Sequence, residues 1–167
     1  MYQLRCTKKA QDALGLKSAD LSEPSGENFA LGNWYVNFFT QNKRKCLFVM
    51  EETTLSSFVL VGLRKEHVKD IGKMFKNGVV KLLELECFPP ENICAFENAP
   101  EQVIFTKTAN KKLLGNMNDL MSLYERFIYN DGGINNCDLS AIIMKINRIP
   151  QKKLDWKYSI DALHEAL

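Results

Sequence analysis

The sequence lacks the features that mark membrane-spanning, secreted and zinc-binding proteins. Among its 167 residues no apolar run approaches the ~20 residues of a transmembrane helix. Its first residues, Met1 to Cys6, contain no hydrophobic stretch like that of a signal peptide. There are only two histidines, and no two cysteines are separated by two residues, so a zinc site has few ligands to draw on. We therefore expect a cytoplasmic protein without a metal or another cofactor.

The five cysteines are an odd number at irregular spacing. We interpret them as reduced thiols, several of them buried as small hydrophobic side chains. Such thiols fit the reducing conditions of the cytoplasm.

Familiar catalytic and phosphate-binding motifs are also missing. The sequence contains no GxxxxGK[ST], GxGxxG or GxSxG. Residues 51–57 are rich in hydroxyl groups, but a serine nucleophile needs a nearby base and an oxyanion hole, and both histidines lie in predicted amphipathic helices where a surface role suffices. Glu84 and Glu86 are two apart on a predicted helix and point in different directions, so they do not form a metal pair. We predict no catalytic residue, and the sequence favours a protein that is not an enzyme without deciding the question.

The composition is that of one folded domain spanning residues 1–167. Hydrophobic residues make up 46% of the chain and charged residues 25%, which is enough apolar material for a single core. The net charge of +2 is too small to indicate nucleic-acid binding by the whole molecule, although local clusters of charge can still matter.

Residue patterns predict an α+β fold with a mostly antiparallel sheet of about five strands covered by helices. The predicted strands are residues 2–6, 33–41, 44–51, 58–61 and 102–106. The predicted helices are residues 7–14, capped by Thr7 and ended by Gly15, 64–86, 116–130 with Asn116 or Asn118 as its cap, 138–147 capped by Asp138, and 160–167.

The remaining segments are predicted to connect these strands and helices. Residues 16–31 carry serine, proline and glycine without periodicity and predict a long mobile loop. Residues 88–100 follow a helix ended by Pro89 and Pro90 and predict an irregular connection. Gly72 and Gly78 weaken the second helix, which a close packing contact or a bend would explain.

Residues 33–41 form an aromatic strand with two possible uses. Alternation places Trp34 and Phe38 on one face and Tyr35 and Phe39 on the other. The first interpretation buries both faces in the core. The second leaves one face half-open as a stacking surface for a base.

Positive residues gather at the ends of the predicted elements. Twelve of the 22 lysines and arginines lie in four such clusters. The clusters are Arg5, Lys8 and Lys9; Lys43, Arg44 and Lys45; Lys107, Lys111 and Lys112; and Arg148, Lys152 and Lys153.

Two of these clusters combine lysines with threonines between a strand and a helix, where unpaired N–H groups favour an anion. If the first and fifth strands are parallel neighbours, both junctions open at the same sheet edge. We therefore predict a binding site for an anionic small molecule, a nucleotide or a phosphorylated ligand. Its predicted residues are Thr7, Lys8, Lys9, Lys107, Thr108, Asn110 and Lys111.

Other interpretations stay open. Thr7 can be a helix cap and the lysines a solvated surface. The chain can instead be a protein-interaction domain, an inhibitor or antitoxin-like partner, that uses residues 16–31 and 88–100 as contact loops. A third hypothesis is an enzyme with an unfamiliar site. The small net charge disfavours nucleic acid as a partner.

Several motifs together resemble a family of small bacterial and mobile-element proteins classed as a domain of unknown function. They are RCTKK from Arg5, WYVN from Trp34, RKCLF from Arg44, ETTLS from Glu52, TKTANKKLLGNMND from Thr106 and NRIP from Asn147. The resemblance implies a single cytoplasmic domain with polar residues at strand–helix junctions and no known activity. A mobile-element setting is compatible with a role in phage defence or counter-defence.

Overall fold

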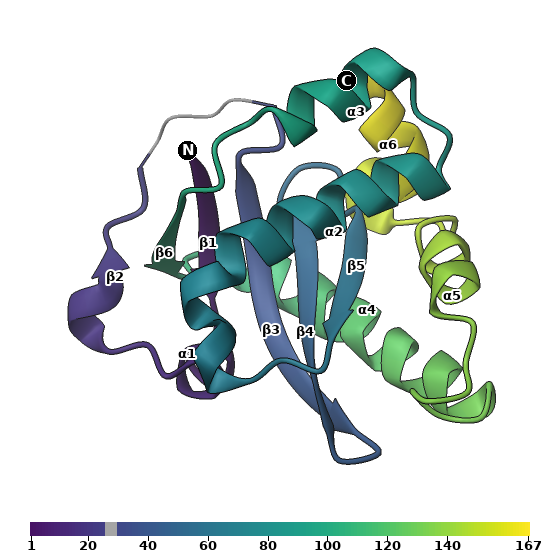
Figure 1. Ribbon diagram of the computed structural model, residues 1–167. Helices are drawn as coiled ribbons and strands as arrows, with labels where there is room; N and C mark the ends of the chain where they lie inside the picture. The colour runs from purple at the N-terminus through teal and green to yellow at the C-terminus, as the bar shows by residue number, and fades with distance from the viewer. Residues whose placement is uncertain (26–29) are drawn as a thin grey trace.

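The computed structural model describes residues 1–25 and 30–167 as helices packed on one mixed sheet (Figure 1). The sheet has six strands in the order β2-β6-β1-β3-β4-β5. The strands are β1 (Tyr2–Cys6), β2 (Leu21–Ser22), β3 (Asn33–Gln41), β4 (Arg44–Glu51), β5 (Ser57–Val61) and β6 (Val103–Lys107). This confirms the α+β class and adds the two-residue strand β2 to the five that were predicted.

The two halves of the sheet differ in strand direction. Strands β3, β4 and β5 form the antiparallel meander that the sequence predicts. Strand β1 pairs in parallel with both β3 and β6, and β2 pairs in parallel with β6. A mostly antiparallel sheet is therefore correct for one half alone, because connections through helices return the chain in the same direction in the other half.

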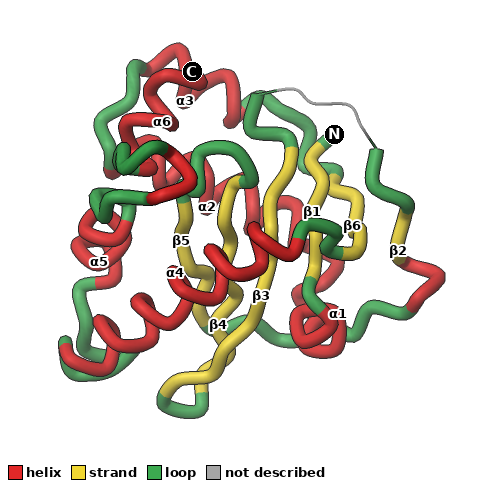
Figure 2. The backbone as a smooth tube through the Cα atoms, turned by 180° about the vertical axis from the view of Figure 1, so that it is seen from behind, coloured by secondary structure: helices red, strands yellow, loops and turns green. Residues whose placement is uncertain are grey.

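Helices cover both faces of the sheet (Figures 1 and 2). One face carries α2 (Ile71–Leu85), and α1 (Lys8–Leu14) packs beside the 3₁₀ segment η2 (Lys65–Asp70) that leads into α2. Helix α4 (Lys111–Asn130) crosses the opposite face against β3 and is followed by α5 (Leu139–Ile146). The helices are α1 (Lys8–Leu14), η1 (Ser18–Asp20), η2 (Lys65–Asp70), α2 (Ile71–Leu85), α3 (Pro90–Glu97), α4 (Lys111–Asn130), α5 (Leu139–Ile146), η3 (Lys152–Leu154) and α6 (Ser159–Ala166).

Several predicted helix ends are confirmed in detail. The Thr7 hydroxyl accepts a hydrogen bond from the Ala10 N–H and caps α1, and Gly15 ends the same helix with φ of 71°. Asp138 caps α5 by accepting from the Ala141 N–H. At each point a short polar side chain or a glycine supplies the geometry that the helix end needs.

The glycines of α2 mark close packing, as predicted. A Cβ atom on Gly72 would overlap the backbone oxygen of Glu101, and one on Gly78 would overlap the ring of Phe58. The helix itself is shorter than the predicted 64–86, because its first part winds as the 3₁₀ segment η2.

Two other helix predictions were wrong. The stretch 88–100 contains α3, because Pro90 stands at the first helical position, where its missing N–H is not needed. Helix α4 starts at Lys111, with Asn110 rather than Asn116 or Asn118 as its cap. Gly115 is accommodated within the first turns of this helix.

The segment 16–31 is more ordered than predicted over the residues that the structure describes. It contains η1 and then β2, which extends the sheet beside β6. Residues 26–29 of the predicted loop lie outside the described residues.

The aromatic strand lies in the core on both faces. Trp34 packs edge-on against Phe75 of α2, with ring centroids 5.2 Å apart, and Tyr35 is fully buried. Phe39 is also buried and Phe38 is partly buried against the core, so neither face of the strand offers an open row of aromatic rings and the stacking-surface interpretation was wrong. All five cysteines are free thiols, of which Cys6 and Cys46 are buried. None of the helices in the described residues is long and apolar enough to cross a membrane.

Candidate functional site

A band of polar side chains crosses the parallel half of the sheet on the face toward α4. Arg5 in β1 pairs in register with Thr106 of β6 on one side and with Tyr35 of β3 on the other. Because paired residues of neighbouring strands share a face, these three side chains form one row. Gln3 and Asn33, two residues earlier in their strands, form a second polar pair on the same face. The core of the sheet is thus interrupted by polar groups at this position.

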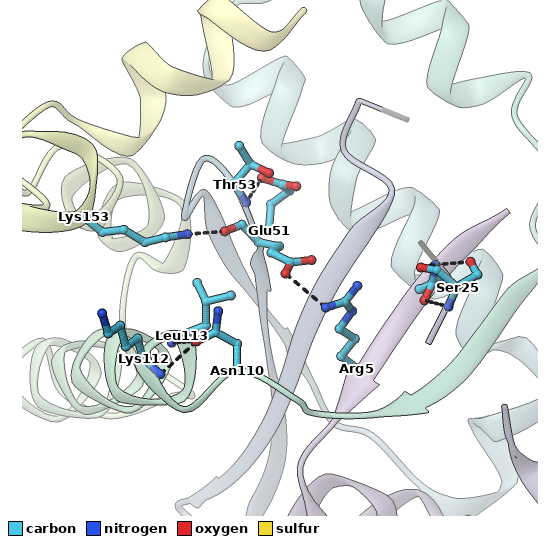
Figure 3. Close-up of polar contacts among 10 residues, drawn as sticks. Arg5, Ser25, Glu51, Thr53, Asn110, Lys112, Leu113 and Lys153 are labelled. Atoms are coloured by element: carbon cyan, nitrogen blue, oxygen red, sulfur yellow. Dashed lines mark hydrogen bonds and ion pairs between the residues drawn. The ribbon is translucent and has the colours of Figure 1, made fainter. Parts of the chain in front are cut away.

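A hollow of about 430 Å³ lies over part of this band, where Arg5 and Asn33 line it. It is bounded by β1, the start of β3, the turn after β4, the first turn of α4 and η3 (Figure 3). Its lining, which we call the polar hollow, consists of Arg5, Ser25, Gly32, Asn33, Glu51, Glu52, Thr53, Asn110, Leu113 and Lys153. Six separate segments of the chain meet there.

Arg5 is the most enclosed positive charge of the polar hollow. Its side chain is 12% exposed, and its Nη1 donates to the Glu52 carboxylate at 3.0 Å. The guanidinium also lies 5.8 Å from the centroid of the Tyr35 ring. Among the described residues, the buried Nε of Arg5 has no hydrogen-bond acceptor, and the hydroxyl groups of Thr106 and Tyr35 in the same row have no partner either. These three polar groups therefore have hydrogen-bonding capacity that the described residues do not use.

Glu51 is a buried carboxylate at the end of β4, with 2% of its surface exposed. Its Oε2 accepts from the Thr53 N–H at 2.8 Å, the Thr54 N–H at 2.6 Å and the Thr54 hydroxyl at 2.9 Å. Burial raises the pKa of Glu51, and the hydrogen bonds from Thr54 and Thr53 oppose that rise. A carboxylate held in this way keeps an oxygen for a donor from outside.

Lys153 reaches the polar hollow from η3, opposite Arg5 (Figure 3). Its Nζ donates to the backbone oxygen of Glu52 at 2.7 Å. Partial desolvation lowers the pKa of Lys153, while the charges of Glu52 and Glu51 act in the opposite direction. Two groups with shifted pKa values, Glu51 and Lys153, thus line one hollow, a pattern that is common at functional sites.

Asn110 brings the start of α4 to the polar hollow. Its side-chain oxygen accepts from the N–H groups of Lys112 at 3.0 Å and Leu113 at 3.3 Å, which fixes the first turn of the helix. The partial positive charge of this helix end adds to that of Arg5 and Lys153. The hollow therefore offers positive groups on three sides and the carboxylates of Glu51 and Glu52 on the fourth.

The two predicted junctions lie side by side, as expected. Cys6 and Lys107, the last residues of β1 and β6, are paired in the parallel ladder. The chain then leaves toward α1 on one face of the sheet and toward α4 on the other. A hydrogen-bonded chain joins the two sides: the Thr7 hydroxyl donates to the Asn37 oxygen at 2.9 Å, and Asn37 donates to the Asn118 oxygen at 3.2 Å.

Only part of the predicted residue set faces the polar hollow. Asn110 is in its lining. Thr7 is a helix cap, and Lys8 pairs with Asp12 at 2.9 Å on the surface. The remaining predicted residues lie outside the described lining, mostly exposed: Lys9, Lys107, Thr108 and Lys111.

Sequence reasoning missed the other lining residues, for which the local signals are weak. Arg5 and Lys153 belong to two of the basic clusters, but nothing local connects residue 5 to residue 153. Glu51 and Glu52 stand in the hydroxyl-rich stretch that was considered only for catalysis. The local signal for this region is an arginine, Arg5, within the predicted strand 2–6, because arginine is almost never buried unless it has a partner.

Comparison with protein families gives one clear match. A family described as a domain of unknown function (DUF6933) matches residues 3–162. The comparison with curated proteins finds no match. The matched range includes every lining residue of the polar hollow.

Proposed function

Because the chain belongs to the DUF6933 family, whose description gives no activity, we propose a function from the site alone: a non-enzymatic module that binds a small anionic molecule in the polar hollow. A nucleotide or another phosphorylated compound is the proposed class of ligand. Such a compound combines an anionic group, for the positive groups, with hydrogen-bond donors, for Glu51.

The observation that carries the proposal is the state of Arg5. A guanidinium that is 12% exposed keeps one N–H without an acceptor in the described residues, at the wall of an open hollow. Leaving a buried polar group unpaired costs about 1–3 kcal/mol, so such groups need a reason. The Nε atom itself is closed to solvent, so a ligand oxygen would bind the part of the guanidinium that the hollow exposes.

The lysines and threonines of the two junctions are proposed as the outer part of the same site. Lys107, Thr108 and Lys111 flank Asn110 along the chain, whereas Lys8 and Lys9 begin α1 on the other face of the sheet and would act on an approaching anion only from a distance. Their exposed ammonium groups would attract an anion toward the hollow without holding it tightly.

A thermal-shift screen of nucleotides and sugar phosphates at millimolar concentration tests the proposal. A ligand at 100 times its Kd stabilises a protein by about 2.7 kcal/mol, which the melting temperature would record. We expect Arg5→Gln to abolish the shift and the pair Lys107→Gln and Lys111→Gln to reduce it. Lys73→Gln, an exposed control in α2, should leave it unchanged.

Two results would contradict the proposal. One is the absence of any shift across the screen, which would favour the alternative of a protein-interaction domain. The other is a shift that survives Arg5→Gln undiminished, which would place the ligand elsewhere. The melting temperature of each unliganded variant shows whether it is folded.

A further inference from the structure

A second hollow, distant in the fold from the polar hollow, is lined by positive side chains from two loops. It has a volume of about 410 Å³ and lies between the β3–β4 hairpin tip and the loop after β5. Its lining, which we call the basic hollow, consists of Lys43, Arg44, Lys45, Gly62, Leu63, Arg64 and Lys65. Five of these seven residues are cationic, and none is acidic.

The charges of the basic hollow are largely uncompensated. In the described residues its one acidic partner is Glu66, whose carboxylate lies 3.5 Å from Arg64. Some exposed lysines elsewhere on the molecule do pair with carboxylates, for example Lys8 with Asp12 and Lys157 with Glu165. Five positive charges therefore stand together in a chain whose net charge is only +2. A concave wall concentrates their field.

The two loops that carry these charges are held together. The backbone oxygen of Lys45 accepts from the N–H groups of Gly62 at 2.9 Å and Leu63 at 3.2 Å. The hairpin, which extends beyond the end of the sheet in Figure 1, is fixed at its tip as well, because the Asn42 oxygen accepts from the Ile134 N–H at 3.1 Å. The positive groups are thus presented from a fixed backbone rather than from free loops.

The guanidinium of Arg44 is positioned from two sides. Its Nη1 donates to the Asn135 oxygen at 3.1 Å. Its Nη2 lies over Gly62, where an added Cβ atom would come within 3.1 Å of it. An arginine fork that is oriented before binding loses less freedom when it binds an anion and suits the paired oxygens of a phosphate.

We propose that the basic hollow binds a ligand with adjacent phosphate groups. A single carboxylate would neutralise one of the five charges, whereas neighbouring phosphates neutralise several. The lining has no aromatic residue, so recognition rests on phosphate charge and not on base stacking. Adjacent phosphates occur in free polyphosphates and in the backbone of nucleic acids. The proposal shares no residue with the polar hollow and does not depend on the function proposed for it.

Binding of inorganic tripolyphosphate and of a 20-base-pair DNA duplex of random sequence tests the proposal in two arms. Both are measured on the full chain, by calorimetry and by fluorescence anisotropy, between 50 and 200 mM salt. The test variant is Arg64→Gln with Lys65→Gln. The control, Lys17→Gln with Lys81→Gln, removes the same charge from exposed positions outside the basic hollow.

We expect the test variant to weaken binding at least tenfold, and the control less than twofold. For the duplex, the slope of log affinity against log salt should become shallower by roughly 2 in the test variant. Binding of tripolyphosphate alone identifies a compact polyphosphate as the ligand class, and binding of the duplex alone identifies a phosphodiester backbone. Absence of both at 50 mM salt, or equal losses in the test and control variants, would overturn the proposal.

Discussion

The polar hollow and the buried polar cluster beside α5 both place polar side chains in the interior. The two regions differ in how completely these side chains are hydrogen-bonded. In the cluster, formed by Ser57, Tyr124 and Asn147, the Asn147 amide is fully engaged. Its side-chain oxygen accepts from the Ser57 N–H at 2.9 Å, and its Nδ2 donates to the backbone oxygens of Ser57 at 2.8 Å and Ile143 at 2.9 Å. In the polar hollow, Arg5 keeps a free N–H among the described residues.

The difference separates polar groups that hold the fold from polar groups that are open to a ligand. Asn147 satisfies both backbone groups of a residue on the edge strand β5 and so ties that edge to α5. Among the described strands, β5 is the last in the sheet, so no neighbouring strand satisfies these groups. Arg5 lies on a central strand, where the ladder is complete without its side chain. Its burial is therefore not required by the backbone.

The largest predicted loss of stability comes from a substitution in the cluster of Ser57, Tyr124 and Asn147. Asn147→Ala leaves the N–H of Ser57 without its acceptor in the interior and removes two further hydrogen bonds, so we expect a loss of about 3 kcal/mol in the free energy of unfolding. Urea unfolding followed by circular dichroism measures it. A loss below about 1 kcal/mol would mean that water replaces the amide, and the contrast between the two regions would weaken.

A smaller effect is expected at the other side of the same cluster. The Tyr124 hydroxyl donates to the backbone oxygen of Ser57 at 3.0 Å, but Asn147 also donates to that oxygen. Tyr124→Phe should therefore cost about 1 kcal/mol in the same urea titration, because Ser57 stays partly satisfied. A cost equal to that of Asn147→Ala would show that the hydroxyl and the amide act as one inseparable unit.

The smallest predicted change in the free energy of unfolding is an increase, and it comes from a substitution in the polar hollow. Because burial raises the pKa of Glu51, its contribution to stability is greatest when the carboxyl is protonated and is lost as the pH rises through that raised pKa. Glu51→Gln retains an oxygen for Thr53 and Thr54 without the buried charge. We expect it to stabilise the protein by about 0.5–1 kcal/mol at pH 7.

Unfolding at two pH values checks this sign. The gain from Glu51→Gln should shrink toward pH 4, where the wild-type carboxyl takes up its proton. Destabilisation by Glu51→Gln at pH 7 would instead assign Glu51 to the structural class, together with Asn147.

Local chemistry made much of the fold predictable, and long-range pairing limited the rest. Thr7, Gly15 and Asp138 could be identified because a helix end is decided by a few neighbouring residues. Helix α3 was missed because Pro89 and Pro90 were read as an end only, although Pro90 also suits a helix start. Asn110 was missed as a cap because Asn116 and Asn118, nearer the apolar stripe, competed for the role.

The candidate site was harder to predict for the same reason. The parallel pairing of β1 with β6 was anticipated as a condition, and it brings the two junctions together. Which side chains then face one hollow depends on the faces that α1 and α4 cover, and no local pattern encodes that choice. Arg5 and Lys153 meet only because η3 folds back against the turn after β4.

Glu52 receives the side chain of Arg5 on its carboxylate and that of Lys153 on its backbone oxygen. Arg5 belongs to β1, whereas Lys153 belongs to η3, which follows all six strands of the sheet in the sequence. A chain without η3 keeps every strand of the sheet but lacks one wall of the polar hollow. Removal of η3, for example by proteolysis, would therefore abolish ligand binding before it disturbs the pairing of the strands.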